Sequence, residues 1–227
     1  AQRQWWATIA SLTLGLLLAA ATAQGQEKKV RKPEPKPSLH GFLVLPVPVV
    51  NNMFKEVTDV VGQLDFKFQG PVLKQGLGLG VGAKGSLFDL RENALAPANI
   101  AGDVRRWTFY GQVQYEHYTG PITYYQFAAQ MGSSKYTWNS ANCTEPNTQQ
   151  GLFWGANVSY FVHASDNLAF GLLLGYEHDA SRMTPDLLCL ESYPGRTDKG
   201  PSAPYQFITI GLGFSTRFTK TQEGPNW

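Results

Sequence analysis

The chain has 227 residues, with 19 Lys and Arg against 17 Asp and Glu, so its formal net charge is +2. This balance gives no reason to expect nucleic acid as a partner. The mildly polar mean hydropathy excludes a bundle of membrane-spanning helices, because each helix would need about 20 consecutive apolar residues. An aromatic content of 13% and 23 glycines favour many short strands joined by tight turns instead.

The N-terminus has the three parts of an export signal. Arg3 supplies a short positive region, residues 5–18 are apolar, and Ala21-Thr22-Ala23 has the small-x-small pattern that a signal peptidase accepts. We predict a signal peptide over residues 1–23, cleaved after Ala23. The alternative is a retained membrane anchor, since the apolar run is near spanning length.

Residues 24–40 are predicted to form a periplasmic linker. The segment 24–38 holds three prolines and five basic residues, so it cannot bury a core and favours an extended, solvated chain. A basic arm that touches the cell wall or an anionic head group is the alternative function for the same residues.

From Gly41 onward the sequence alternates between apolar and polar residues with period two, which indicates strands with two different faces. Between Gly62 and Gln69, for example, Leu64, Phe66 and Phe68 share one face, and the residues between them are polar. The same alternation predicts seven strands, at residues 62–69, 76–84, 107–116, 125–132, 152–162, 168–177 and 205–218.

The connections between these strands are short at one end and long at the other. Residues 69–76, 118–122 and 163–168 predict short turns, whereas residues 89–106, 133–150 and 181–204 predict long loops. This asymmetry is typical of outer-membrane barrels, whose turns face the periplasm and whose loops face outside. In this orientation the strand that begins at Gly62 runs toward the periplasm. A strand that runs toward the exterior must therefore precede it.

Residues 42–50 are the available apolar segment for that partner, and they make the number of strands eight. Pro46 and Pro48 lie on one face of this segment and cannot donate to a ladder, so we expect a distorted first strand. The fold class predicted for residues 41–218 is therefore an all-β, eight-stranded antiparallel up-and-down transmembrane β-barrel. Residues 219–227 are predicted to form a periplasmic tail.

The polar faces of the strands are rich in Gly, Ser, Gln and Asn, which suit a crowded interior better than a surface. A soluble barrel of the lipocalin kind would have the two faces reversed. The glycine row that begins at Gly76 leaves space for a large neighbour such as Tyr110 or Tyr124. Because an eight-stranded barrel is only wide enough for its own side chains, no continuous pore is expected.

Six charged residues fall on predicted interior positions, three of each sign. Each of them must be paired or hydrogen-bonded, because an isolated charge would cost several kcal/mol. We predict a balanced ionic network inside the barrel, formed by Asp65, Lys67, Lys84, Glu116, Glu177 and Arg217.

The export signal, the eight strands with short inner turns and the last strand, Thr209-Ile-Gly-Leu-Gly-Phe-Ser-Thr-Arg-Phe218, resemble small outer-membrane barrels of the OmpA, OmpX and OmpW kind. The last strand also resembles the C-terminal signal for membrane insertion, with a glycine and spaced aromatics. Residues 42–50 resemble the first strand of barrel proteins common in Bacteroidetes. The resemblance implies an outer-membrane location more firmly than an activity.

Two cysteines lie in neighbouring predicted loops, Cys143 in the third and Cys189 in the fourth. Disulfides form in this compartment, so we predict a bridge between them. Residues 134–139 and 191–196 mix aromatic and polar side chains, as sugar-binding and protein-binding surfaces do. The predicted contact residues of these loops, for which an ordinary solvated loop is the alternative, are Tyr136, Trp138, Tyr193 and Arg196.

No catalytic, metal or cofactor site is predicted. Glu177-His178-Asp179 alternates between faces, so at most two of the three could address one ion. Residues 76–81 are strand alternation with no helix after them, which does not fit a phosphate loop. His163-Ala164-Ser165 resembles the His-x-Ser of the lipid A deacylase family, but a turn at the periplasmic end explains it better.

These observations favour a non-enzymatic outer-membrane barrel that acts as a structural or interaction subunit through its extracellular loops. Its expected partners are outer-membrane lipid and other outer-membrane or surface proteins. One alternative is an OmpW-like carrier of small apolar ligands or lipids, which would need a cavity lined by Phe153, Phe161, Leu173 and Phe207. Another is an envelope lipid-modifying enzyme, for which these residues provide no catalytic triad.

Overall fold

The computed structural model describes residues 36–50, 52–73, 75–194 and 203–218. The predicted signal peptide, most of the predicted linker and the predicted tail 219–227 lie outside the described residues, as does Arg196. Within the described ranges, no helix has both the length and the apolar character needed to cross a membrane.

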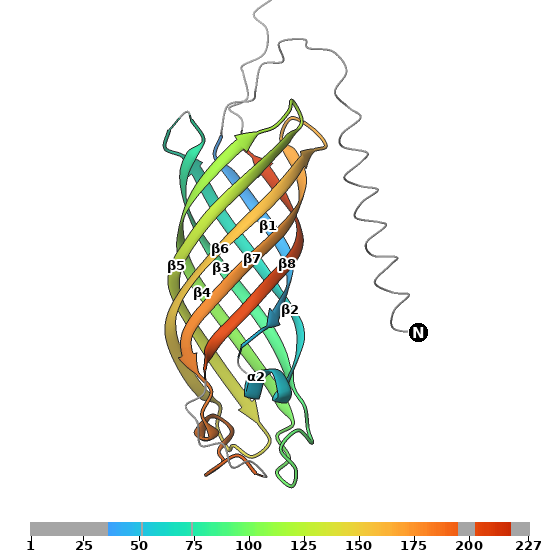
Figure 1. The fold of residues 1–227 in the computed structure, drawn as a ribbon, viewed down its shortest axis with the longest axis vertical. Helices are drawn as coiled ribbons and strands as arrows, with labels where there is room; N and C mark the ends of the chain where they lie inside the picture. The colour runs from blue at the N-terminus through green and yellow to red at the C-terminus, as the bar shows by residue number, and fades with distance from the viewer. Residues whose placement is uncertain (1–35, 51, 74, 195–202, 219–227) are drawn as a thin grey trace, which may run out of the picture. The chain divides into compact units, whose positions relative to one another are not determined.

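Eight antiparallel strands form a closed barrel in which each strand pairs with its neighbours in sequence and β1 pairs with β8 (Figure 1). This confirms the predicted fold class. The strands are β1 (Ser38–Pro48), β2 (Thr58–Pro71), β3 (Leu77–Leu90), β4 (Gly102–Tyr118), β5 (Thr123–Ser140), β6 (Asn147–His163), β7 (Leu168–Arg182) and β8 (Pro204–Arg217). Two short helices, α2 (Asn52–Val57) and η1 (Pro185–Leu188), lie in the connections.

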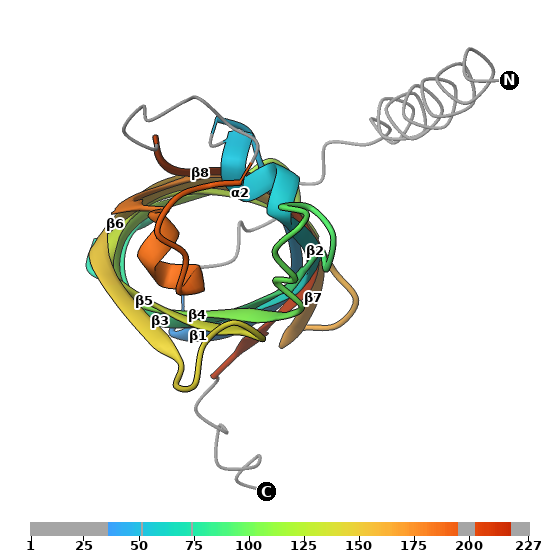
Figure 2. The same ribbon diagram turned by 90° about the horizontal axis from the view of Figure 1, so that it is seen from below.

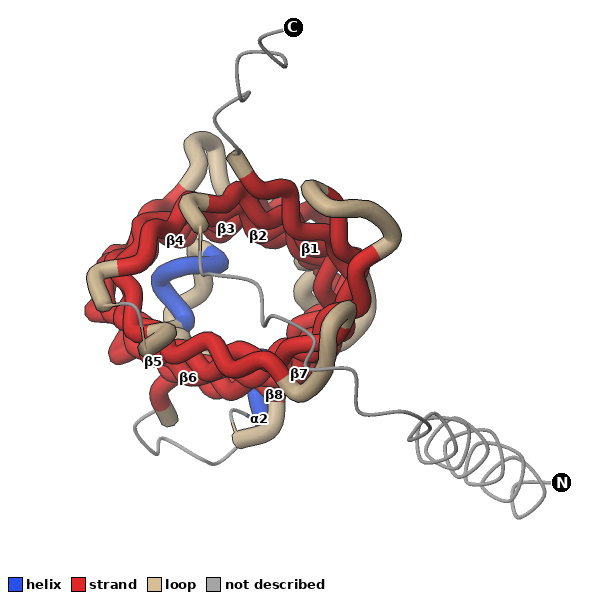
Figure 3. The backbone as a smooth tube through the Cα atoms, turned by 90° about the horizontal axis from the view of Figure 1, so that it is seen from above, coloured by secondary structure: helices blue, strands red, loops and turns tan. Residues whose placement is uncertain are grey.

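The two ends of the barrel differ. Tight turns at residues 72–76, 119–122 and 164–167 join the strands at one end, the turn end, which is seen face-on in Figure 3. The other end carries α2, η1 and the connections 91–101 and 141–146, and is called the capped end below (Figure 1, bottom). The sequence predicted this asymmetry.

The predicted loop 133–150 is much shorter in the structure, because β5 continues to Ser140 and β6 begins at Asn147. Its inward residues Tyr136 and Trp138 are buried, and its outward residues are polar. The two strands continue with polar residues on their outward face, so the polar composition was wrongly interpreted as a loop.

The first strand starts at Ser38, four residues before the predicted start at Phe42, and its pairing with β8 has no register shift. The Val49 amide donates to the Gln206 carbonyl at 3.0 Å. Because alternate amides of a strand point to the same side, those of Val47 and Leu45 also point toward β8. Pro46 and Pro48 therefore face the β2 side, where the ladder has already ended at Val44. The ladder to β8 is regular because neither proline removes a donor from it, whereas the ladder to β2 ends two residues before Pro46.

The apolar residues face outward and the polar residues face inward over the middle of the barrel, as predicted. Leu64 and Leu212 on the outer surface are 52% and 65% exposed, whereas Asp65 and Lys67 are 1% exposed. The glycine row of β3 is filled as expected at Gly82, where an added Cβ would overlap the ring of Tyr110.

Aromatic side chains mark both ends of the apolar outer surface. Trp107 and Trp154 are exposed toward the capped end, and Tyr160 is exposed toward the turn end. Two other aromatic residues near the strand ends, Tyr118 and Tyr205, are buried in the lumen instead. They share the inward face of their strands, as the alternation of β4 and β8 requires.

Candidate functional site: the lumen and its cap

The capped end of the lumen is closed by an apolar core, which we call the cap cluster. It consists of buried side chains from α2, η1, the 91–101 connection and the adjoining strand ends. The ring of Phe54 lies at its centre, with centroids 5.0–5.9 Å from those of Phe88, Trp138, Tyr205 and Phe207. Figure 2, a view onto this end, shows η1 lying across the barrel opening.

The predicted loop contacts Tyr136 and Trp138 belong to this cluster and are fully buried. Their placement on an exposed loop is therefore corrected: both are inward residues of β5. Tyr193 is half-buried and packs against the cluster, and burial raises its pKa to about 12. These aromatics hold the connections onto the barrel instead of forming its outermost surface.

A buried group of charges, the ionic cluster, lies next to the cap cluster and is centred on Glu177. This carboxylate accepts hydrogen bonds from Lys84 Nζ at 2.7 Å, Arg106 Nη2 at 2.6 Å and Gln63 Nε2 at 3.1 Å. Lys84 also lies 4.0 Å from Asp65. The sequence analysis missed Arg106, although its even spacing from Thr108 placed it on the inward face.

The six predicted interior charges are all buried, but they do not form one network. Glu116 and Arg217 make a separate ion pair of 2.8 Å, which Tyr118 joins by donating to Glu116. Lys67 Nζ has no hydrogen-bond partner among the described residues and lies 5.1 Å from the ring centroid of Phe42.

Arg106 and Asp179 add one buried charge of each sign to the six predicted ones, so the buried charges of the described chain remain balanced. The four cations are Lys67, Lys84, Arg106 and Arg217, and the four anions are Asp65, Glu116, Glu177 and Asp179. Equal numbers reduce the electrostatic cost of burying them, and the paired geometry lowers it further.

The four apolar side chains expected to line a carrier cavity are buried but separated. Phe207 is part of the cap cluster, whereas Phe161 and Leu173 belong to a second apolar cluster with Phe42. Phe153 packs between them against Tyr110, at a centroid distance of 6.0 Å. Among the described residues they therefore fall into separate packed groups.

The grooves described for this barrel lie on its outer apolar surface. One has a volume of about 840 Å³ and is bordered by Leu79, Val113, Met131 and Trp154, all of which are exposed. Small residues such as Gly111 form its floor. Such grooves fit acyl chains packed around a barrel.

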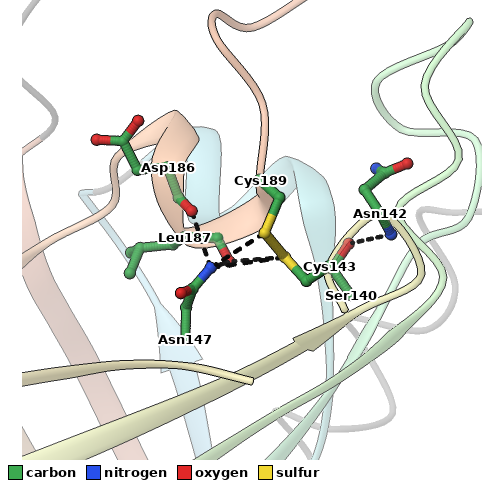
Figure 4. Close-up of a disulfide and its surroundings, with 7 residues drawn as sticks. All are labelled: Ser140, Asn142, Cys143, Asn147, Asp186, Leu187 and Cys189. Atoms are coloured by element: carbon green, nitrogen blue, oxygen red, sulfur yellow. Dashed lines mark hydrogen bonds between the residues drawn. A yellow bond between two sulfur atoms is a disulfide. The ribbon is translucent and has the colours of Figure 1, made fainter. Parts of the chain in front are cut away.

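The predicted disulfide between Cys143 and Cys189 is present, with the two Cα atoms 5.4 Å apart. It ties the 141–146 connection to the residue that follows η1 (Figure 4). The Asn147 side-chain amide adds a hydrogen bond of 2.9 Å to the Asp186 carbonyl. The bridge and this amide hold η1 over the lumen.

The sequence motifs with possible chemistry take structural positions. Within the described part of the chain, no three His, Cys, Asp or Glu side chains converge on a possible metal position. His178 stacks on Trp154 on the outer surface, while Glu177 points inward. Ser165 lies in a tight turn, where its hydroxyl accepts from the Leu168 amide at 3.2 Å.

A closed eight-stranded barrel with an apolar exterior and a packed, charged interior defines the class of small outer-membrane β-barrel folds. No protein-family model and no curated protein matches this sequence. Solved structures do resemble it. Neisserial surface protein A has a TM-score of 0.51 and 7% identity, over 80% of this chain and 97% of that one.

The outer membrane protein OprG from Pseudomonas aeruginosa gives a TM-score of 0.50 and 11% identity, over 84% of this chain and 98% of that one. At these identities the similarity shows the fold alone. It agrees with the strand count and closure predicted from the sequence.

Proposed function

We propose that this protein is a non-enzymatic outer-membrane barrel that acts as a structural or interaction subunit and presents its capped end to the cell exterior. The observation that carries the proposal is the combination of an apolar outer surface with a lumen closed by the cap and ionic clusters. A closed lumen leaves the outer surface and the cap as the places where this protein can act.

The apolar exterior supports a location in lipid. Exposed residues at the centre of the strands, such as Leu172 at 59%, would be costly in water, at about 25 cal/mol per Å² of apolar surface. In the outer membrane the tight turns would face the periplasm. The predicted signal peptide, its cleavage after Ala23 and the Bacteroidetes resemblance of the first strand remain predictions.

The cap supports an interaction role because it is a rigid polar surface. The disulfide and the cap cluster hold its backbone, which lowers the entropy lost on binding. Its exposed polar side chains among the described residues include Glu92, Asn93, Asn142, Glu145, Asp186 and Glu191. Outer-membrane lipid around the barrel and other surface proteins at the cap are the partners we propose.

The test is purification from native outer membranes in mild detergent, followed by mass spectrometry of everything retained. We expect a protein partner that is lost from the double variant Asn142→Ala, Glu145→Ala and kept by a control variant at the turn end, Gln75→Ala. Lipid retained without any protein would favour the carrier alternative. A mature chain that stays monomeric in buffer without detergent would refute a membrane location.

A lipid-modifying activity is tested separately. Cells that express the parent and cells that express Ser165→Ala should have the same lipid A composition. A difference between them would refute the non-enzymatic assignment.

A further inference from the structure

One groove on the outer surface, which we call the Arg105 groove, combines apolar walls with a cation at one end. It has a volume of about 600 Å³ and is bordered by exposed apolar side chains of β1 to β3, such as Leu64, and by Arg105 and Trp107 of β4. Because β4 runs from the capped end toward the turn end, Arg105 lies at the capped-end margin of the groove. The grooves beside Trp154 and beside Phe127 are lined by uncharged residues of the described chain. The Arg105 groove can therefore receive an apolar chain together with the anionic group attached to it.

The strand arrangement explains the depth of the Arg105 groove. The ladder between β1 and β2 ends at Val44 and Gln63, although both strands continue toward the capped end. Gly62 lies where the two strands part, and a Cβ added there would meet only the Val44 carbonyl oxygen, at 4.0 Å. On β3, a Cβ added at Gly85 would lie 3.2 Å from the Trp107 ring, so the indole lies close against the backbone. The missing side chains leave a hollow that has Trp107 as one wall.

Arg105 is oriented by its neighbours but keeps donors for a ligand. Its Nε donates to Asp103 Oδ2 at 2.7 Å, and Asp103 also accepts from the Asn139 side-chain amide at 3.1 Å. The Arg105 Nη groups make no hydrogen bond to the described residues, and the side chain is 60% exposed. Lys135 on β5, directly opposite Trp107, is a second exposed cation beside the groove. Two cations from neighbouring strands can thus address one anionic group.

The charges near this groove are ordered along the strands. Leu87 and Arg105 pair with each other and both border the groove. Asp89 and Asp103 pair with each other farther toward the capped end, outside the lining of the groove. An anionic group attached to a chain in the groove therefore meets the cations before it meets the carboxylates.

We propose that the Arg105 groove docks one acyl chain of a phosphorylated glycolipid of the outer leaflet, whose phosphate lies on Arg105 and Lys135. A guanidinium binds phosphate through parallel hydrogen bonds, and a lysine adds a point charge. Thr137 lies opposite Arg105 and Gln150 lies opposite Lys135, so hydroxyl and amide groups beside the cations can pair with sugar hydroxyls. The inference rests on the proposed function, which places the capped end, and with it these cations, at the outer leaflet.

The test separates this inference from the proposed function. It uses purified protein and a single lipid, so it depends neither on the orientation of the barrel in cells nor on a protein partner. Failure of the lipid to bind leaves the co-purification result intact, and the reverse also holds. A lipid carried inside the barrel would be kept by variants of the outer surface, whereas a lipid docked in this groove would be lost from them.

The experiment is a titration of the full mature chain, folded in detergent micelles, with diphosphoryl lipid A, followed by native mass spectrometry of the complexes. We expect the parent to bind one lipid A more tightly than any that follow. Arg105→Gln should weaken this first binding about tenfold, the effect of losing a hydrogen bond to a charged group. Lys135→Gln should weaken it about threefold, as expected for an exposed ion pair. Added NaCl should weaken binding to the parent more than binding to the double variant.

The apolar part of the site is tested by filling the groove. Ala83 lies in its lining, so Ala83→Phe should weaken binding at least as much as Arg105→Gln while every charge is kept. The matched control is Ala129→Phe, the same change in the grooves lined by uncharged residues, which should leave affinity unchanged. Arg182→Gln, which removes an exposed cation on β7, should also leave affinity unchanged.

Heat-modifiable migration on SDS gels confirms that each barrel is folded, and Ala83→Leu replaces Ala83→Phe if the latter does not fold. Parallel titrations use phosphatidylglycerol and phosphatidylcholine. Equal affinity of the parent for lipid A and phosphatidylglycerol would overturn the assignment to a glycolipid. Unchanged binding to Arg105→Gln, or equal weakening by Ala83→Phe and Ala129→Phe, would overturn the site itself, because lipid would then coat the barrel without preference.

Discussion

Removal of the Glu177 carboxylate is the sharpest test of how the barrel interior is stabilised. In Glu177→Leu, Arg106 would lose the carboxylate with which it pairs and Lys84 would keep Asp65 at 4.0 Å. Breaking a buried ion pair from one side costs about 3–5 kcal/mol, because the remaining charge stays buried. Since Asp65 compensates Lys84 in part, we expect a loss of about 4 kcal/mol, a large fraction of the 5–15 kcal/mol typical of a folded domain.

The assay is urea unfolding of the refolded barrel in detergent or lipid vesicles, followed by tryptophan fluorescence. Glu145→Leu, at an exposed position of the cap, is the control and should change stability by less than about 0.5 kcal/mol. The double variant Arg106→Met, Glu177→Leu should recover part of the loss, because it leaves no unpaired guanidinium. A loss below about 1 kcal/mol in the single variant would refute the view that the ionic cluster is a coupled unit.

Three further outcomes follow from the structure. Replacement of both Cys143 and Cys189 by Ser should lower stability by up to about 4 kcal/mol, the loop-entropy value for a separation of 46 residues, and thiol reagents should label neither cysteine in the unreduced parent. Leu172→Arg should cost about 2–4 kcal/mol in lipid vesicles, whereas Thr148→Arg, near the capped end of β6, should cost at most about 1 kcal/mol. Because burial raises the pKa of Tyr193 to about 12, its contribution to cap stability is present below pH 10 and is lost as the pH rises through 12; Tyr193→Phe should remove this loss when cap opening is followed by proteolysis.

The central part of the barrel could be predicted from the sequence because one physical rule governs it. Over the middle of β2 to β8 exposed apolar side chains alternate with buried polar ones, so alternation such as Leu64, Asp65 and Phe66 gives both the strands and their faces. The charges that must pair were visible as polar residues on the inward face. Which of them would pair was not visible, because cross-barrel distances depend on strand register and stagger.

The helix α2 was not predicted because its signal is local and weak. Six residues are too few to show a helical period, and Phe54 stands out only once its four ring neighbours from β3, β5 and β8 are known. These neighbours are distant in sequence.

The faces of the long strands invert near the capped end, and this inversion explains both the misassigned loop and the cap. On β4 and β5 the outward residues change from apolar to charged at Arg105 and Lys135, while the inward residues change from polar to aromatic at Tyr136. Trp107, exposed and directly opposite Lys135, marks the level of the change. With the membrane location proposed above, the barrel is surrounded by lipid on the turn-end side of this level, where polar groups must face inward. On the capped-end side it is surrounded by water, and apolar groups face inward instead. A period-two analysis that assigns one hydrophobic face to each strand therefore fails beyond this level. Under the proposed location, the residues at which it fails mark the outer membrane interface and the cap cluster beyond it.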